Sequence, residues 1–130
     1  MAELTELAKK LIDGKNFANV ATVMPDGSPQ VATVWVEREG DVVVINATTK
    51  RQRYRNLMRD PSVALCIFDM ANPYSTVMIR GMAIEITTND AEEGIDRLSL
   101  KYNGRKYPWH SPDQPRVIIR IRPDRVSQMG

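Results

Sequence analysis

Two tight-turn signals constrain the fold of this 130-residue chain more than any other feature. They occupy residues 25–28 (Pro-Asp-Gly-Ser) and 38–41 (Arg-Glu-Gly-Asp), and these residue types favour turns. The flanking segments, 17–24, 30–37 and 42–46, are rich in small and β-branched residues and predict strands. Three antiparallel strands joined by short turns form a meander, so the first half of the chain predicts a β-sheet.

Three further segments predict strands in the second half, at residues 62–68, 75–87 and 116–121. Gly81 lies in the middle of the second of them, which indicates a bulge or a bend where a sheet curls. Pro123 is expected to limit the last strand. A polar loop is predicted at 69–74, between the first two of these strands, and another at 103–115.

Helices are predicted at three places: 3–13, 50–59 and 89–102. Thr49 is the expected N-cap of the middle helix, and Asp60-Pro61 ends it. Six strands and these helices within one expected domain, 1–130, indicate a closed or nearly closed antiparallel barrel.

The counts of reactive residues exclude several classes of protein. With one cysteine, Cys66, the chain can form no intrachain disulfide and no four-thiolate zinc site. One histidine, His110, excludes mechanisms that need two imidazoles in one chain. No apolar run approaches the roughly 20 residues of a membrane span, so a cytoplasmic protein is expected. Cys66 lies in an apolar strand and is predicted to be a buried small hydrophobe.

A basic cluster is the first candidate site. Residues 50–59 hold five cations and no acid, although the net charge of the whole chain is only +2. Free amide groups at a helix start, the helix dipole and guanidinium forks together favour an anion site. Arg55 and Arg59 are worse placed for it than the residues nearest the strand end, which are Thr48, Thr49, Lys50, Arg51 and Arg53. A solvated basic face is the alternative, and the near-neutral total argues against nucleic acid.

Two aromatic features accompany the cluster. The strand that contains Gln30 and Trp35 can lay a flat ligand along its backbone, although Trp35 is equally compatible with a core or a dimer interface. The loop 107–110 (Tyr-Pro-Trp-His) is compatible with a lid or an interface hook. A lone loop histidine is a weak candidate for acid–base catalysis. Arg116, Arg120, Arg122 and Arg125 are expected to be solvated, with an approach of some of them to an anionic ligand as the alternative. The chemistry of the residues alone therefore indicates a small β-barrel with one anion site.

Several short motifs occur in one order along the chain: 26–30 (DGSPQ), 35–36 (WV), 45–48 (INAT), 51–57 (RQRYRNL), 60–65 (DPSVAL), 72–74 (NPY) and 79–81 (IRG). Together they resemble the pyridoxamine 5′-phosphate oxidase-like superfamily of flavin-binding split β-barrels. Within it the chain looks most like the small oxidoreductases that depend on the deazaflavin coenzyme F420. The later motifs at 95–98 (IDRL), 107–109 (YPW) and 121–126 (IRPDRV) also look like that branch.

This resemblance implies a mainly β protein, a six-stranded antiparallel split β-barrel with short helices, which forms a homodimer with two cofactor sites at the interface. It implies hydride transfer from reduced F420 to an electron-poor small molecule such as an enone, a quinone or a tetrapyrrole. The cofactor carries the chemistry, so no catalytic side chain is expected. Neither a membrane nor a nucleic acid is an expected partner.

The family's cofactor site is carried over by position. The residues implied to line the ring or its side chain, largely through their backbone, are Gln30, Val31, Ala32, Thr33 and Trp35. Those implied to border it are Asn46, Ala47 and Thr48. Those implied to grip the phosphate are Thr48, Thr49, Arg51 and Arg53. The family often has lysine where Arg53 stands, and arginine keeps the charge with a different contact geometry.

FMN is the alternative cofactor, because it shares a ring plan and a phosphate with F420. Oxidation of pyridoxamine phosphate itself is disfavoured, since the chain is shorter than those oxidases and lacks their paired late Arg/His motif. A non-catalytic flavin- or F420-binding protein is the third possibility, and heme storage on the same barrel is weakened by the single histidine.

Overall fold

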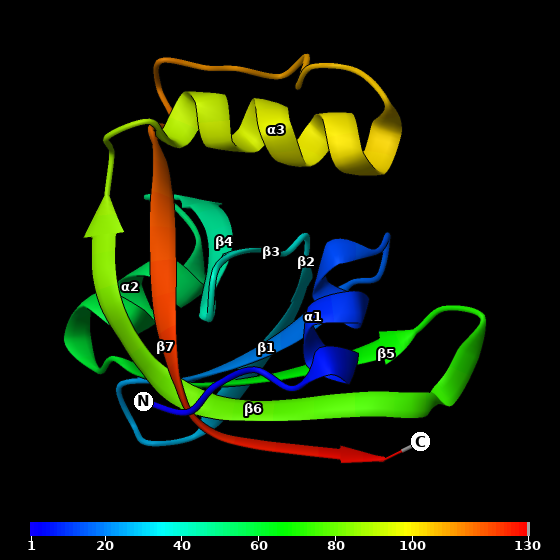
Figure 1. Ribbon diagram of the computed structural model, residues 1–130. Coiled ribbons are helices and arrows are strands. Elements are labelled where there is room, and N and C mark those ends of the chain that lie inside the picture. Colours follow the sequence, from blue (N-terminus) through cyan, green and yellow to red (C-terminus); the bar gives the residue numbers. More distant parts are fainter. Residues whose placement is uncertain (130) are drawn as a thin grey trace.

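The computed structural model describes residues 1–129 and has three helices and seven strands in that range (Figure 1). In chain order these are α1 (Glu6–Asp13), β1 (Ala18–Val23), β2 (Pro29–Val34), β3 (Glu37–Glu39), β4 (Val42–Thr48), α2 (Gln52–Arg59), β5 (Ser62–Asp69), β6 (Asn72–Thr87), α3 (Ala91–Asn103) and β7 (Arg116–Met129). The mainly β class is as predicted. No helix within residues 1–129 has both the length and the apolar character that crossing a membrane requires.

All seven strands form one antiparallel sheet in the order β2-β1-β5-β6-β7-β4-β3. The sheet is not closed by hydrogen bonds, because β2 and β3 are its two edges. They are neighbours in the chain, yet β2 pairs with β1 and β3 pairs with β4. Both hairpins of the predicted meander are present, because β1 pairs with β2 and β3 pairs with β4. The single strand expected at 30–37 is two strands at opposite edges of the sheet, so the continuous meander and the count of six strands are wrong.

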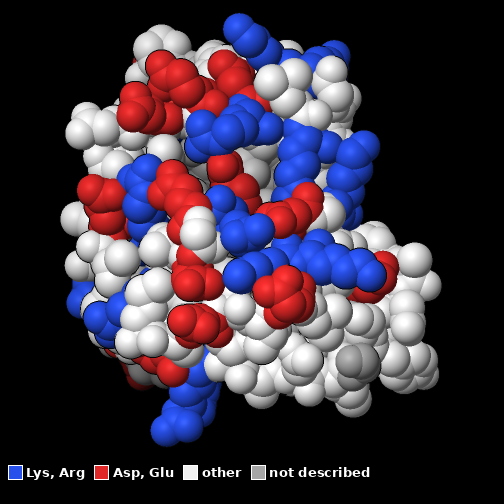
Figure 2. All heavy atoms as spheres, in the orientation of Figure 1, with Lys and Arg blue, Asp and Glu red and all other residues white. Residues whose placement is uncertain are grey.

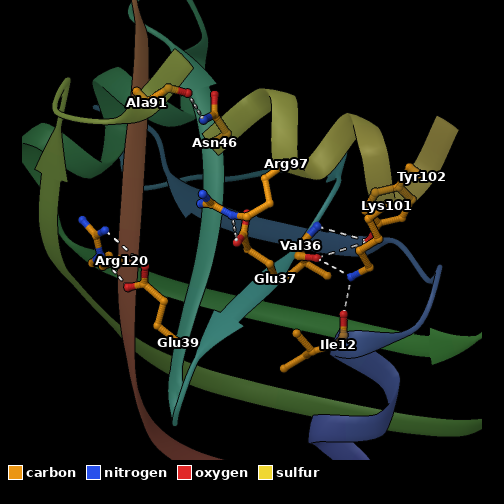
Figure 3. Close-up of polar contacts among 10 residues, drawn as sticks. All are labelled: Ile12, Val36, Glu37, Glu39, Asn46, Ala91, Arg97, Lys101, Tyr102 and Arg120. Atoms are coloured by element: carbon orange, nitrogen blue, oxygen red, sulfur yellow. Dashed lines mark hydrogen bonds and ion pairs between the residues drawn. The ribbon is translucent and has the colours of Figure 1, made fainter. Parts of the chain in front are cut away.

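The break between β2 and β3 has a local cause at Val36, which is fully buried. Its amide nitrogen donates to the Tyr102 hydroxyl at 3.2 Å, and its carbonyl oxygen accepts from Lys101 Nζ at 2.7 Å (Figure 3). Side chains of α3 thus satisfy backbone groups that a neighbouring strand would otherwise have to satisfy. The chain can leave one edge of the sheet and join the other without orphaned polar groups.

β6 and β7 are the long strands, they pair along most of their length, and both bend sharply near the N-terminal segment (Figure 1). The register shifts between Arg80 and Gly81, and Gly81 lies opposite Pro123. A Cβ on Gly81 would lie 2.0 Å from the Arg122 carbonyl oxygen, so only glycine fits there. The predicted bend at Gly81 is confirmed. The expected strand end at Pro123 is wrong, because at the register shift β7 tolerates a proline and continues to Met129.

The core lies between α1 and the inner face of the curved sheet. Ala8, Leu11 and Ile12 of α1 pack with the apolar side chains of the strands, and Ile45, Ile67 and Ile119 are among the fully buried ones. Each large aliphatic side chain buried in this way stabilises the fold by about 1.5–3 kcal/mol before entropy is counted. A second, smaller apolar cluster, Val44, Ala91 and Ile118, holds α3 on β4 and β7.

Three local expectations differ from the structure. Arg51, not Thr49, is the N-cap of α2 and gives no side-chain cap bond, whereas the Thr49 amide donates to the Pro115 carbonyl oxygen at 3.2 Å. The loop at 69–74 is a tight turn, since Asp69 pairs with Asn72 and β6 begins there. Cys66 is only partly buried, because alternate residues of β5 face the core and Cys66 lies on the other face.

Candidate functional site

A cavity of about 530 Å³ opens between the edge strand β2, the start of α2, α3 and the loop that precedes β7. The polar and charged residues that line it are Thr33, Asn46, Arg51, Arg53 and Arg116. The apolar and aromatic ones are Phe17, Ala32, Val34, Trp35, Ile95, Leu98, Tyr107 and Trp109. The described lining residues include no acid, so the cavity is cationic on one part of its wall and aromatic on another.

Arg53 is a half-buried cation of the cavity wall. Burial, and then the nearby charges of Arg51 and Arg116, lower its pKa to about 10. Its Nη2 donates to the Asn46 carbonyl oxygen at 3.0 Å, but its buried Nε has no partner within residues 1–129. The buried Thr48 hydroxyl also has none, but Thr48 does not line the cavity. Buried polar atoms are normally paired, so the Arg53 Nε favours an anionic ligand at this position.

Asn46, which is buried, holds three elements around this end of β4. Its Nδ2 donates to the Ala91 carbonyl oxygen at the start of α3 at 3.0 Å (Figure 3). Its Oδ1 accepts from Arg116 Nη1 of β7 at 3.3 Å, while its backbone oxygen accepts from Arg53 of α2. Asn46 therefore contacts two of the three arginines of the cavity, Arg116 through its side chain and Arg53 through its backbone carbonyl oxygen.

The aromatic wall is continuous. The ring of Trp35 stacks on Tyr102, with centroids 5.3 Å apart and an interplanar angle of 7°. Tyr107 meets Trp35 edge-on at 6.5 Å and Trp109 at 5.4 Å. The Tyr107 hydroxyl accepts from Arg116 Nη2 at 2.7 Å, which joins the aromatic wall to the cationic one. Trp109 is 64% exposed and stands at the mouth.

Two half-buried titratable side chains, Lys101 and Tyr102, lie behind this wall, at the junction of β2 and β3. Burial lowers the pKa of Lys101, whose Nζ donates to the carbonyl oxygens of Ile12 and Val36 (Figure 3). Burial raises the pKa of Tyr102 to about 12, and its hydroxyl donates to the Asn16 carbonyl oxygen. Tyr102 stays neutral near pH 7 and both side chains bond backbone groups, so their role here is structural.

The structure brings half of the sequence-predicted site residues into the cavity wall. Those that line it are Ala32, Thr33, Trp35, Asn46, Arg51 and Arg53. Those that do not are Gln30, Val31, Ala47, Thr48, Thr49 and Lys50. Val31 is 63% exposed, Ala47 belongs to the core, and the Gln30 amide oxygen accepts from Thr22. Gln30 and Val31 stand nearer the turn between β1 and β2 than Ala32 and Thr33, which do line the cavity.

Arg51 and Arg53 share the cavity because Arg51 precedes α2 in extended conformation, so helical spacing does not separate them. Arg55 and Arg59 do not line it, as predicted. Arg116 was expected to be solvated. The register that sets Thr48 of β4 opposite Arg116 of β7 brings it to the site, and no signal in the sequence gives that register.

For some of the remaining lining residues, the sequence contains features that indicate a place at the site. Ile95 and Leu98 lie three apart, and this spacing marks an apolar helix face. Tyr107 and Trp109 belong to the loop already identified as a possible lid. Phe17 and Val34 carried no signal beyond strand patterning. Within residues 1–129 there is no group of three or more His, Cys, Asp or Glu placed to hold a metal ion.

The open antiparallel sheet, with a cavity beside its edge strand, is the architecture of a known family. A family model described as pyridoxamine 5′-phosphate oxidase matches residues 4–130. The chain therefore belongs to the pyridoxamine 5′-phosphate oxidase family, as the sequence motifs predicted.

Solved structures agree with this assignment. An F420 reductase is 34% identical, with a TM-score of 0.86, and the match covers 95% of this chain and 98% of that one. A conserved hypothetical protein from Mycobacterium tuberculosis is 22% identical over 97% of this chain and 84% of its own, with a TM-score of 0.73. General stress protein 26 from Bacillus anthracis is 19% identical over 95% and 92%, with a TM-score of 0.74. The last two share the fold. No protein of curated function matches the chain.

Proposed function

We propose that this protein is an F420-dependent oxidoreductase that transfers a hydride from reduced deazaflavin to an electron-poor organic acceptor of the enone, quinone or tetrapyrrole type. The observation that carries the proposal is the 34% identity to an F420 reductase over 95% of the chain. Together with the family match, it supports an oxidoreductase of the flavin or F420 type.

The residues of the cavity fit such a cofactor. Its phosphate would be held by Arg51 and Arg53, and the buried, unpartnered Arg53 Nε supports this placement. Its ring would lie along Ala32 and Thr33 beside Trp35, where an edge strand offers backbone groups that no further strand pairs. Asn46 borders both parts. The positions outside the cavity wall, Gln30, Val31, Ala47, Thr48, Thr49 and Lys50, stay predictions from the family resemblance.

When bound, the deazaflavin supplies the hydride. The chain's own residues bind, orient and exclude water. The guanidinium groups fix the anionic end of the ligand through charge-assisted hydrogen bonds, and the aromatic wall limits the tilt of a flat ring. Arg53 remains a cation near pH 7 even with its pKa lowered to about 10, so it donates hydrogen bonds and moves no proton. We expect water to supply the proton that completes a reduction.

The experiment that tests this function compares two cofactors on the purified protein. FMN and F420 are titrated separately, and ring fluorescence reports binding. Tight F420 binding followed by reduction of an enone, quinone or tetrapyrrole supports the proposal. Binding of FMN without binding of F420 would replace it with an FMN-dependent member of the family. Binding of reduced F420 without reduction of any acceptor would indicate a binding protein.

We also propose a homodimer. The β5–β6 hairpin and the end of β7 expose large apolar side chains, with Tyr74 77% exposed and Met70, Met78 and Met129 more than 40%. In Figure 2 this part of the surface, at the lower right, is largely free of charged side chains. An apolar surface of this kind favours association with another chain. Sedimentation equilibrium tests it, and a single species of monomer mass would contradict it. The single domain and the cytoplasmic location stay predictions.

A further inference from the structure

The segment 104–115 connects α3 to β7 and carries two residues of the cavity wall, Tyr107 and Trp109. Side chains hold it at three points. The Tyr107 hydroxyl accepts from Arg116 Nη2, the Tyr107 amide donates to Asp96 Oδ1 at 3.0 Å, and His110 bonds to α3. The rings of Tyr107 and His110 meet edge-on, with centroids 5.5 Å apart, so these points are in contact. His110 therefore contributes two of the bonds that keep Tyr107 and Trp109 at the cavity mouth.

Both ring nitrogens of His110 face carboxylates of α3. Nδ1 bonds a carboxylate oxygen of Glu92, and Nε2 lies 2.7 Å from Asp96 Oδ1. Glu92 and Asp96 are four residues apart, so they lie on one face of the helix and form a pincer. An ionised carboxylate accepts hydrogen bonds but cannot donate them. Both nitrogens can be satisfied together only when the ring carries two protons.

We propose that His110, in its doubly protonated form, is the positioning residue that holds segment 104–115 on α3 as a lid, with Tyr107 and Trp109 at the cavity mouth, and that loss of one ring proton frees one side of the pincer and loosens the lid. The lid itself is inferred from the His110 contacts with Glu92 and Asp96. Its effect on cofactor binding rests on the proposed function.

The charged groups around the pincer define the direction of the pH effect. Asp96, and then Glu92, raise the pKa of His110 above its ordinary value of 6.5. The His110 hydrogen bond lowers the pKa of Asp96, with smaller contributions from the Tyr107 amide and Lys106. Arg116, which stands over the Tyr107 ring, is the remaining cation nearby.

The sign follows from linkage. A group whose pKa is raised by the closed lid stabilises the closed form fully below its ordinary pKa of about 6.5, and loses this effect as the pH rises through the raised value. The lid is thus held in mildly acidic solution up to about pH 6.5, and it loosens as the pH rises through the raised pKa of His110. At strongly acidic pH the carboxylates become protonated, and the pincer is lost there as well.

The first test is an NMR titration of the imidazole Hε1 signal, which is unambiguous because the chain has one histidine. We expect a pKa above about 6.5 that falls in Glu92→Gln. Glu93→Gln is the matched control, because Glu93 is an exposed neighbour on the same helix turn and has no contact with the ring among the described hydrogen bonds and ion pairs. A His110 pKa at its ordinary value, or equal pKa shifts in Glu92→Gln and Glu93→Gln, would show that the two carboxylates do not hold the protonated ring.

The second test follows the lid itself. The chain has two tryptophans, so Trp35→Phe leaves Trp109 as the only one. Its emission is expected to shift to the red as the pH rises through the His110 pKa, and His110→Gln is expected to abolish the dependence. Emission that stays constant while His110 titrates would show that the ring does not hold the lid.

The third test links the lid to the site. F420 affinity is measured one unit below and one unit above the His110 pKa, in wild type and in Glu92→Gln. Each unit of pKa that the mutation removes corresponds to about a tenfold smaller pH effect. A pH-dependent Trp109 signal without F420 binding would remove the proposed function and leave the lid intact. Equal pH dependence in both proteins would overturn the link between lid and site.

Discussion

Arg53 donates from Nη2 to the carbonyl oxygen of Asn46 at 3.0 Å, and this bond ties the first turn of α2 to the end of β4. It orients a buried guanidinium group without pairing it to an acid, so the positive charge stays available to a ligand. The unpartnered Nε of the same group marks a position for a hydrogen-bond acceptor.

Replacing Arg53 with alanine is expected to weaken binding of F420 or FMN by about 1–3 kcal/mol, because a charge-assisted hydrogen bond is lost. Isothermal titration calorimetry measures the change. Arg55→Ala is the matched control, since Arg55 lies on the same helix but bonds only to Lys50 and Gln52. Equal losses in the two variants would indicate a general effect of charge instead of a phosphate contact.

Arg116→Gln is expected to have two effects. It removes one cation of the cavity, which should weaken cofactor binding by about 1–3 kcal/mol, and it removes the charged donor at 2.7 Å from the Tyr107 hydroxyl. Trp109 should then become more accessible to an acrylamide quencher. Arg122→Gln serves as the control on the same strand, because Arg122 pairs with Asp124 outside the cavity. If the Arg116 variant binds normally, Arg51 and Arg53 hold the anion without Arg116.

Gly81→Ala is expected to lower the free energy of unfolding by about 1–3 kcal/mol or more, because the new methyl group overlaps the Arg122 carbonyl oxygen. Urea unfolding followed by circular dichroism measures it. The neighbouring exposed Arg80→Ala should change the free energy by no more than about 0.5 kcal/mol. A Gly81 variant of wild-type stability would show that β7 can move away at the bend.

Tyr102→Phe is expected to lower the free energy of unfolding by about 1–3 kcal/mol, because the buried Val36 amide and Asn16 carbonyl oxygen lose a partner. Tyr74→Phe is the comparison, since the Tyr74 side chain is exposed and its change should be within about 0.5 kcal/mol. Equal stabilities of the two variants would mean that water replaces the Tyr102 hydroxyl at no loss.

The ion pair between Glu39 and Arg120 predicts a pH-dependent contribution to stability. The Arg120 hydrogen bond at 2.7 Å lowers the pKa of Glu39 below its ordinary 4.5. The stabilisation is therefore complete above about pH 4.5 and disappears as the pH falls through the lowered pKa. Glu39 is partly exposed, so the difference between wild type and Glu39→Gln should be only about 0.2–1 kcal/mol. Urea unfolding of both proteins at several pH values measures it, and a difference that persists in acid would contradict this origin.

Much of the fold could be predicted because its signals are local. The turn residues, the β-branched runs and Gly81 act on their immediate neighbours. The break at Val36 could not be predicted, because the segment around it is uniformly favourable to a strand. The groups that permit the break, Lys101 and Tyr102, follow it by 65 and 66 residues.

The candidate site likewise contains residues that could be predicted from the sequence and residues that could not. Arg51 and Arg53 could be predicted from charge density and their position after a strand. Arg116 could not, because only the pairing of β4 with β7 brings it to Asn46. Thr49 is not the N-cap of α2, because its amide donates to the carbonyl oxygen of Pro115, the residue that precedes β7. The helix therefore begins two residues later than expected, at Gln52.

The bonds from Lys101 and Tyr102 to Val36 have a consequence for how this sequence can evolve. Neither side chain lines the cavity, yet together they join the two edges of the sheet beside it. Substitutions at these two positions are limited by the need of the buried Val36 amide and carbonyl groups for hydrogen-bond partners, and not by contact with a ligand. In a screen of variants for activity, changes at Lys101 or Tyr102 would imitate active-site defects, and only a measurement of folding would separate the two causes.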